Sequence, residues 1–135
     1  MQLPSSEEIV DDLAFFDDWE QRYQYIIDLG KQIPGLSEEA KTPDKIVKGC
    51  QSSVWLDYKT EDGKFLFEVD SDAVIVQGLL VLVLSAYNNR TAKEILDFDI
   101  DAYFTELDLE RHITPTRGNG LRAIVGKIRQ LASAV

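Results

Sequence analysis

The stretch from Ala73 to Tyr87, AVIVQGLLVLVLSAY, constrains the fold more than any other part of this sequence. Valine and isoleucine are common in strands, but the length of the stretch and the preceding Asp70-Ser71-Asp72 favour a helix with a polar N-cap. Its most apolar part is shorter than the roughly 18 residues that suggest a membrane span. Because a helix that is apolar on nearly every side must be buried, we predict a central helix between a sheet and other helices.

Before this stretch, the hydrophobic period changes from that of a helix to that of a strand. Alternate positions are apolar from Val54 to Tyr58 and again from Phe65 to Val69, which is the two-residue period of a half-buried strand. Between these runs lies Asp62-Gly63, a pair that tolerates the positive φ of a tight hairpin. The sequence therefore predicts two antiparallel strands.

Helical segments are predicted before this hairpin. Ser5 and Glu8 have the spacing of a capping box, so a first helix is expected to begin there. Apolar residues at helical spacing continue to Ile27, and Gly30 followed by Pro34 is a normal end of a helix.

Two short helices and one long helix are predicted after the central one. Thr91 with Glu94 has capping-box spacing and Asp99 can cap a further helix, so residues 91 to 110 are expected to hold two short helices. The long helix is indicated by apolar residues at i, i+3, i+4, i+7 and i+10, which are Leu121, Ile124, Val125, Ile128 and Leu131.

These elements together predict the fold class. Helices on both sides of a hairpin indicate an α+β protein, in which a small antiparallel β-sheet packs against several helices. The chain has 135 residues, of which 44% are hydrophobic, and this suits one domain spanning residues 1–135.

The charge of the chain is negative overall and unevenly distributed. A formal net charge of −10 argues against nucleic acid as a partner, because phosphates require a basic surface. Residues 1 to 40 hold ten acids and two bases, whereas residues 111 to 135 hold five bases and no acid. Either these regions are solvated faces that attract each other within the fold, or they steer a charged protein partner.

Cys50 is the only cysteine and His112 the only histidine, which limits the chemistry of the chain. One thiol cannot form an intramolecular disulfide, a zinc cage of thiolates or a full set of iron–sulfur ligands. The first residues, MQLPSSEEIV, lack the basic and apolar regions of a secretory signal. The expected location is therefore the reducing cytoplasm.

Cys50 lies in VKGCQSSV, between a short extended piece from Lys45 to Lys48 and the strand that starts at Val54. Gly49 lets the backbone bend, and a thiol on such a tip can enter the cleft of a partner. Backbone N–H groups at a turn also favour the thiolate. The alternative is a buried cysteine that behaves as a small hydrophobic residue, and spacing alone leaves both interpretations open.

The second candidate site is HITPTRGNGLRAI. A turn before the final helix is predicted from Pro115, Gly118, Asn119 and Gly120. Arg117 and the N-terminus of the helix can bind an anion there, although a helix cap and a tight turn account for the same residues. His112 can act as a base for Cys50 if the two meet in space, but a lone histidine in a turn more often makes ordinary hydrogen bonds.

Four stretches of the chain together resemble the SufE family of sulfur acceptors. They cover most of the chain and read YIIDLGKQIPGL, VKGCQSSVWL, DSDAVIVQGLLVLVLSAY and HITPTRGNGLRAI. The most specific is GCQSxVW, in which the cysteine, its turn and the following strand match together. The resemblance implies a small α+β fold similar to that of iron–sulfur scaffold proteins.

The resemblance also implies a function and partners. Cys50 would accept sulfur as a persulfide from a cysteine desulfurase, stimulate that enzyme, and pass the sulfur on for iron–sulfur cluster assembly. Gly49 and Gln51 would shape the tip that enters the desulfurase, and Arg117 would stabilise the thiolate or persulfide anion. The implied partners are a SufS- or CsdA-like desulfurase and a SufBCD-like scaffold complex, with this chain as a monomer. Pyridoxal phosphate would belong to the desulfurase, so this chain is expected to bind no cofactor or metal of its own.

Two other functions remain as alternatives. The first is a Cys–His hydrolase or acyltransferase that uses Cys50 and His112 and forms a covalent acyl intermediate. The second is a scaffold that assembles iron–sulfur clusters itself, which a single cysteine makes the weaker choice.

Overall fold

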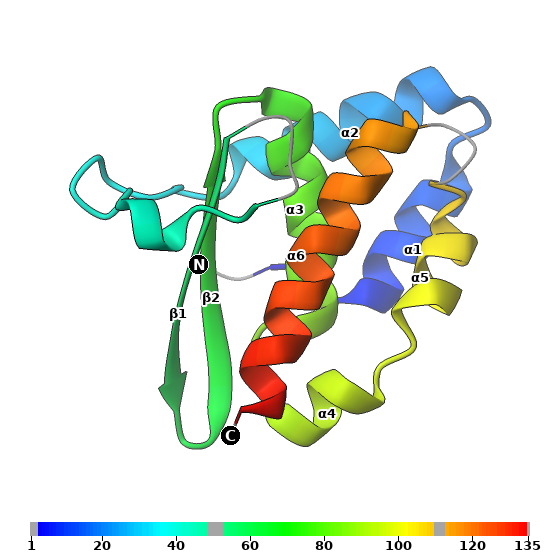
Figure 1. Ribbon diagram of the computed structural model, residues 1–135. Coiled ribbons are helices and arrows are strands. Elements are labelled where there is room, and N and C mark those ends of the chain that lie inside the picture. The colour runs from blue at the N-terminus through cyan, green and yellow to red at the C-terminus, as the bar shows by residue number, and fades with distance from the viewer. Residues whose placement is uncertain (1–2, 49–52, 110–112, 135) are drawn as a thin grey trace.

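The computed structural model describes residues 3–48, 53–109 and 113–134 (Figure 1). The helices are α1 (Ser6–Phe15), α2 (Trp19–Lys31), α3 (Val74–Tyr87), α4 (Ala92–Asp97), α5 (Ile100–Leu107) and α6 (Pro115–Ser133). The strands are β1 (Val54–Glu61), β2 (Lys64–Ser71) and β3 (Arg90–Thr91), and a short 3-10 helix, η1 (Pro43–Lys45), precedes β1. The α+β prediction is confirmed, with the sheet on one side and the helices on the other.

The sheet has the order β1-β2-β3 and is antiparallel throughout. β1 and β2 pair along their whole lengths. β3 pairs only with Lys64 and Phe65, the first residues of β2. The turn residues Asp62 and Gly63 have φ values of 54° and 78°, the positive φ of a tight hairpin. The hairpin prediction is therefore confirmed.

The core lies between one face of the sheet and α3. The buried residues of that face are Val54 and Leu56 on β1 and Phe65, Phe67 and Val69 on β2. α3 is buried without interruption from Gly78 to Tyr87 and contacts β2, α1, α2, α4 and α6. The predicted central helix is thus confirmed. None of the helices in the described part of the chain combines the length and apolar character that crossing a bilayer requires.

The start of α3 differs from the prediction. Its N-cap is Ala73 and no side chain caps it, because β2 continues to Ser71 and takes Asp70 into the strand. The Ser71 hydroxyl accepts a hydrogen bond from the N–H of Ala73, at 3.2 Å. Asp70 instead projects to the opposite side of the sheet, where it binds the loop that leads toward β1.

Three other predicted helix starts, those of α1, α4 and α5, are confirmed. Ser5, Thr91 and Asp99 cap α1, α4 and α5, and each side-chain oxygen accepts the backbone N–H three residues further on. Thr91 and Glu94 form a complete capping box. α4 and α5 are the two short helices expected between residues 91 and 110.

α6 begins earlier than predicted. Residues 115–120 are its first turns, so the prediction of a separate turn there is wrong. The Thr114 side chain caps the helix by accepting the N–H of Arg117, and Pro115 occupies the first helical position, where its missing N–H is tolerated. These start signals, with the buried side chains further along, outweigh the low helix propensity of the glycines. The predicted apolar stripe is confirmed, since Leu121, Ile124, Val125 and Ile128 are buried and Leu131 is partly buried.

Candidate functional site

The two chain segments on either side of residues 49–52 are paired to each other. The N–H of Val47 donates to the carbonyl of Val54 at 2.9 Å, and Ile46 lies opposite Trp55 in an antiparallel bridge. Val47 and Val54 are both buried, which anchors this pair in the core. Residues 47 and 54, on either side of this segment, are therefore held next to each other.

Three of the predicted site residues, Gly49, Cys50 and Gln51, lie between these anchors and outside the described residues. His112 also lies outside them, so the distance from Cys50 to His112 stays untested. The described flanks show what holds the segment. A second contact comes from the carbonyl of Ser53, which accepts the N–H of Asp72 at 3.4 Å and joins the start of β1 to the corner before α3.

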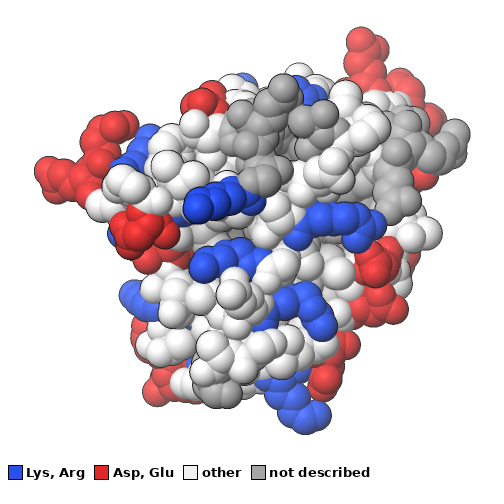
Figure 2. Space-filling view, in the orientation of Figure 1, with Lys and Arg blue, Asp and Glu red and all other residues white. Residues whose placement is uncertain are grey.

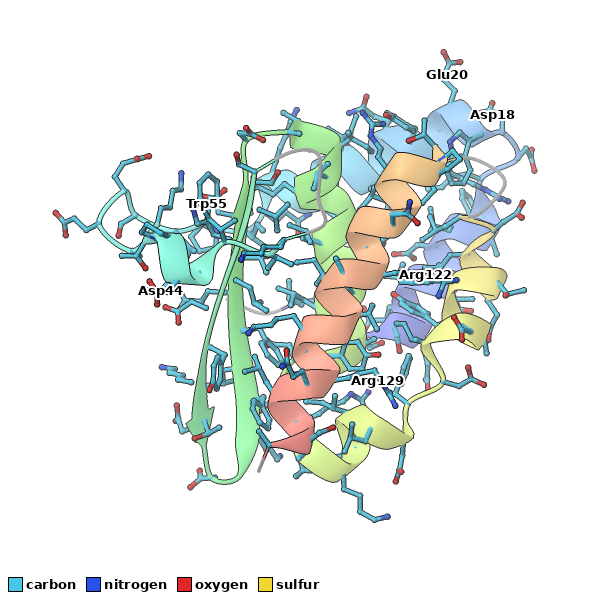
Figure 3. All side chains as sticks on the ribbon, viewed as in Figure 1. Asp18, Glu20, Asp44, Trp55, Arg122 and Arg129 are labelled. Carbon is cyan, nitrogen blue, oxygen red and sulfur yellow. The ribbon has the colours of Figure 1, made fainter. Side chains whose placement is uncertain are left out.

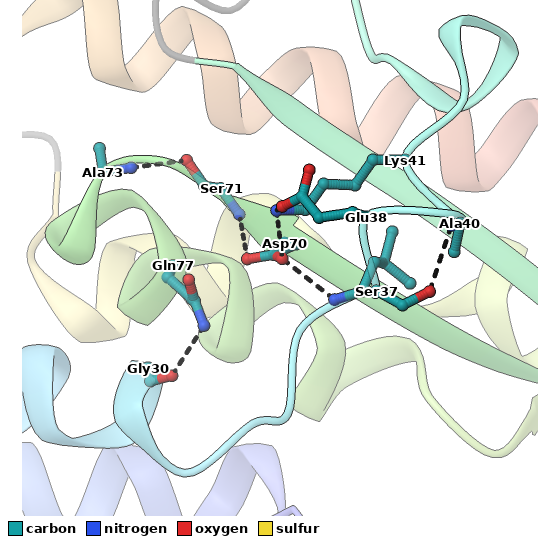
Figure 4. A network of polar contacts seen from close by, with 10 residues as sticks. Gly30, Ser37, Glu38, Ala40, Lys41, Asp70, Ser71, Ala73 and Gln77 are labelled. Carbon is teal, nitrogen blue, oxygen red and sulfur yellow. Dashed lines mark hydrogen bonds and ion pairs between the residues drawn. The ribbon is translucent and has the colours of Figure 1, made fainter.

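Asp70 fastens the loop that leads into this segment (Figure 4). Its carboxylate accepts the N–H of Leu36 at 3.0 Å and the N–H of Ser71 at 2.8 Å. The loop approaches closely at Gly35, whose φ is +72° and where an added Cβ would lie 2.8 Å from the Asp70 carboxylate. Glycine meets both requirements, because it adopts positive φ without strain and has no Cβ.

Lys41 joins the same loop to β1, and we call the contacts of Asp70 and Lys41 with this loop the Asp70 clamp. Its ammonium lies 3.3 Å from carboxylate oxygens of both Glu38 and Asp70, and 5.0 Å from the centre of the Trp55 ring. Hydrogen bonds from Lys41 to the Glu38 and Asp70 carboxylates raise its pKa, so its charge is retained. A cation at this distance over an indole face is attracted by the ring. The loop is thereby held over the outer face of β1, where Figure 3 places Trp55.

One further ion pair secures the last part of the loop. The ammonium of Lys45, at the end of η1, lies 3.1 Å from the Asp57 carboxylate on β1. Together with the bridge between Ile46 and Trp55, this contact directs the chain along β1 as far as Lys48. The expectation of a short extended piece before Cys50 is confirmed at Ile46, whereas Lys45 is part of the 3-10 helix η1.

Arg117 lies in the first turn of α6 and contacts α2. Its guanidinium donates to the hydroxyl of Tyr23 at 3.0 Å, across 94 residues of sequence. The helix N-terminus around it offers few unpaired donors, because Pro115 has no N–H and the N–H of Arg117 itself is bonded to Thr114. The structure therefore shows Arg117 connecting two helices, and its action on an anion at Cys50 stays a prediction.

Tyrosines with altered pKa values lie away from residues 46–55. Tyr103 is buried and donates to the carbonyl of Leu82 at 3.0 Å, and burial raises its pKa. Burial also raises the pKa of Tyr25, with a further contribution from its hydrogen bond to Asp12. Both hydroxyls join parts of the helical layer, so these shifts reflect packing. Among the residues that the structure describes, no three metal-ligating side chains form a group able to hold an ion.

The sequence did not predict the Asp70 clamp or the hydrogen bond between Arg117 and Tyr23. The local pattern predicts Asp70 as part of a helix cap, because a polar residue before an apolar run has the signal of a cap. Its real partner, Leu36, is 34 positions away, and no local pattern indicates it. Strand alternation does place Trp55 on the outer face of β1. A large aromatic side chain there was the one available signal that another segment of the chain covers that face.

These features define the class of the protein, a small α+β domain in which a segment containing the sole cysteine is anchored between two paired residues. Residues 7–132 match the family profile of SufE, described as an Fe-S metabolism associated domain. An uncharacterized SufE-like protein of Rhizobium etli is 44% identical over 134 residues, covering 96% of this chain and 90% of that protein. A second such protein, of Rhizobium meliloti, is 40% identical and covers 96% of each.

The chain belongs to the SufE family. Family membership places it in iron–sulfur metabolism with a sulfur-transfer role, in a family associated with cysteine desulfurases. The fold agrees, since the solution structure of a hypothetical protein from Thermus thermophilus superposes with a TM-score of 0.78. That match covers 99% of this chain and 97% of the other at 18% sequence identity, and it shows the fold alone.

Proposed function

We propose that this protein accepts persulfide sulfur from a cysteine desulfurase onto Cys50, stimulates that desulfurase, and passes the sulfur on for iron–sulfur cluster assembly. The observation that carries the proposal is the hydrogen bond between Val47 and Val54. This bond joins the two residues that flank a six-residue stretch, 48–53, in which the sequence has the sole cysteine of a SufE-family chain. Such a short anchored segment suits a thiol that must enter another protein's active site.

The transfer step is an exchange at sulfur. The Cys50 thiolate attacks the terminal sulfur of the donor's persulfide, Cys–S–SH, and forms a new S–S bond. The S–S bond to the donor cysteine breaks, and its sulfur leaves as a thiolate with the electron pair. The terminal sulfur keeps its proton until it ionises, so the step needs no oxidant or reductant. Its rate depends on the thiolate fraction of Cys50 and on access to it.

A single thiol suits a carrier of this kind. A second cysteine nearby would attack the Cys50 persulfide, close a disulfide and release sulfide before delivery. Cys50 has no such neighbour in this sequence. We further propose that the protein binds no cofactor of its own, with pyridoxal phosphate on the desulfurase, and that it acts as a single-domain monomer in the cytoplasm.

The surrounding residues have separate proposed roles. Gly49 and Gln51 shape the tip that enters a SufS- or CsdA-like desulfurase, and Arg117 stabilises the anionic sulfur. A SufBCD-like scaffold complex is the proposed receiver. Opposite charge within about 4 to 6 Å lowers the pKa of a thiol, which is the effect asked of Arg117.

Intact-mass spectrometry tests the proposal directly. The protein is incubated with a cysteine desulfurase and free cysteine, without reductant, and its mass is measured before and after dithiothreitol. We expect the wild type to gain one sulfur atom that dithiothreitol removes, and Cys50→Ser to gain none. A mass gain that persists in Cys50→Ser, or none with any of several desulfurases, would contradict the proposal.

A matched control tests whether sulfur uptake requires a thiol at position 50 or only an exposed thiol nearby. The double variant Cys50→Ser/Ser53→Cys keeps one thiol in the same part of the chain, because Ser53 is exposed. It should gain no sulfur and should not stimulate alanine release by the desulfurase. Equal sulfur uptake by this variant would show that any accessible thiol suffices.

A further inference from the structure

A groove separates the segment before Cys50 from α6. One side is formed by Pro43, Asp44, Ile46, Val47 and Lys48, and the other by Ala123, Lys127 and Gln130. The three α6 residues are spaced i, i+4 and i+7, so they share one face of the helix. Lys48 precedes Cys50 by two positions, which places the groove next to the segment that bears the thiol.

The groove carries positive charge that its described neighbours do not neutralise. Lys48 and Lys127 are exposed, and among the described residues neither forms an ion pair. One carboxylate, Asp44, also lines the groove, and a hydrogen bond from the Thr42 hydroxyl lowers its pKa, so it stays ionised. Two lysines against one aspartate leave a net positive surface.

The basic surface continues along α6 (Figure 2). Arg122 pairs with Asp101 at 3.1 Å, and Arg129 donates to the carbonyls of Ile95 and Leu96 at the end of α4. Both arginines extend from α6 on the side of α4 and α5 (Figure 3). The helix contains no acid.

Ion pairs between described residues do not join the two regions of opposite charge that the sequence contains. Within the described ranges, no ion pair joins a base of residues 113–134 to an acid of residues 3–40. Because the chain has a net charge of −10, most of its surface repels an acidic partner. The basic surface of the groove and α6 attracts such a partner and so selects its orientation.

Gly126 adds an independent observation. It lies exposed in the interior of α6, and an added Cβ would meet nothing within 4 Å. Glycine in a helix interior is unfavourable relative to alanine, and neither positive φ nor internal packing explains it at this position. Close approach of another chain to the helix backbone would explain it.

Ile46 supplies an apolar contact in the same groove. Its side chain is 46% exposed although it is large and hydrophobic. A ligand that fits this groove therefore has carboxylates for Lys48 and Lys127 and an apolar side chain for Ile46.

We infer that the groove between Lys48 and α6 is the docking site for an acidic segment of the cysteine desulfurase that also presents an apolar side chain. The inference rests on the proposed function, because it assigns the partner that brings sulfur to Cys50. A segment held between Lys48 and Lys127 would bring the donor's sulfur to the part of the chain that contains Cys50.

The test compares two double charge reversals with the same net charge. Lys48→Glu/Lys127→Glu changes the groove, and Lys31→Glu/Lys59→Glu changes exposed lysines on α2 and β1. Binding of the full-length desulfurase is measured at low and at high salt. We expect the groove variant to weaken binding about tenfold at low salt, with a smaller effect at high salt, and the control variant to change it little. Equal weakening by both variants, or none by the groove variant, would overturn the inference.

Other occupants give distinct results. If the groove variant binds the desulfurase and gains sulfur normally but delivers it slowly to a scaffold complex, the groove serves the acceptor and the inference is wrong. The inference is also wrong if wild type binds a labelled oligonucleotide that the groove variant does not. If the wild type gains no sulfur and binds no desulfurase, the proposed function fails first and the inference fails with it.

Variants at Gly126 test the groove without a change of charge. Gly126→Ala should raise Tm, because nothing in the protein lies near the added methyl group, and should weaken desulfurase binding slightly, because the partner approaches the helix backbone there. Gly126→Trp, on the same open face, should keep the fold by circular dichroism and weaken binding severalfold by blocking close approach. Unchanged binding of a folded Gly126→Trp would count against a partner lying on α6.

Discussion

Gly30 and Gly78 are in direct backbone contact where α2 crosses α3. A Cβ added to Gly30 would lie 2.6 Å from the backbone nitrogen of Gly78, and one added to Gly78 would lie 2.1 Å from the carbonyl oxygen of Ile26. The side-chain amide of Gln77 donates to the Gly30 carbonyl at 3.2 Å beside this contact. The two helices can approach this closely only because both positions lack a side chain.

Gly78→Ala should therefore destabilise the protein. Its methyl group meets backbone atoms that cannot rotate away, so we expect the free energy of unfolding to fall by about 1–3 kcal/mol or more. Urea denaturation followed by circular dichroism measures the change. Gly126→Ala is the control, since nothing lies near that position, and it should raise the free energy of unfolding by about 0.5–1 kcal/mol. The same sign for both variants would contradict this packing.

Asp70→Ala should release the loop over β1. The N–H of Leu36 loses its acceptor and Lys41 loses one of its two carboxylate partners. Because a partly buried donor is left unpaired, the free energy of unfolding should fall by about 1–3 kcal/mol. Hydrogen exchange at Leu36 should become faster, and sulfur uptake at Cys50 slower, since the loop leads to that segment. Glu68→Ala, an exposed acid on the same strand, should change neither measurement.

Arg117→Ala and Tyr23→Phe separate the two roles of Arg117. Both remove the hydrogen bond between α6 and α2, so each should lower the free energy of unfolding by about 0.5–1.5 kcal/mol. Only Arg117→Ala removes a positive charge, so it alone should slow persulfide formation and raise the pKa of Cys50 in alkylation-rate profiles. If both variants transfer sulfur at equal rates, Arg117 is purely structural.

The capping box at the start of α4 should make stability depend on acid pH. Hydrogen bonds with Thr91 lower the pKa of Glu94 below its usual 4.5, so its ionised form stabilises the folded state. This contribution is complete above the usual pKa and is lost as the pH falls through the lowered one. Glu94→Ala should therefore be less stable than wild type at neutral pH, and the difference should shrink below that window. A difference in Tm that stays constant down to the acid limit would refute this assignment.

The elements that local patterns predicted correctly share a physical cause. The run from Ala73 to Tyr87, the Asp62-Gly63 turn and the Thr91–Glu94 box each follow from residues a few positions apart, where propensity and periodicity act. The early start of α6 was not predicted, because glycines so close together favour a turn. Thr114 and Pro115 carried the stronger signal for a helix start.

The candidate site divides in the same way. Cys50 is identified by its neighbours in the chain, GCQS and the strand after it, so the family could be recognised from the sequence. The clamp of Asp70 on Leu36 could not be, nor could the meeting of Lys48 with Lys127 across a groove. Each depends on how the loop before β1 packs against the sheet and how α6 packs against α3 and α4.

By itself, the sequence determined the central helix, the hairpin, the caps of α1, α4 and α5, and the family, because these depend on side chains that are neighbours along the chain. Only the tertiary structure decided that Gly30 faces Gly78, that Arg117 reaches Tyr23 over 94 residues, and that two lysines from distant segments line one groove. The physical reason is that such contacts form when separate elements bury their apolar faces together. The hydrophobic periodicity of a segment does not predict which surfaces of different elements then come into contact.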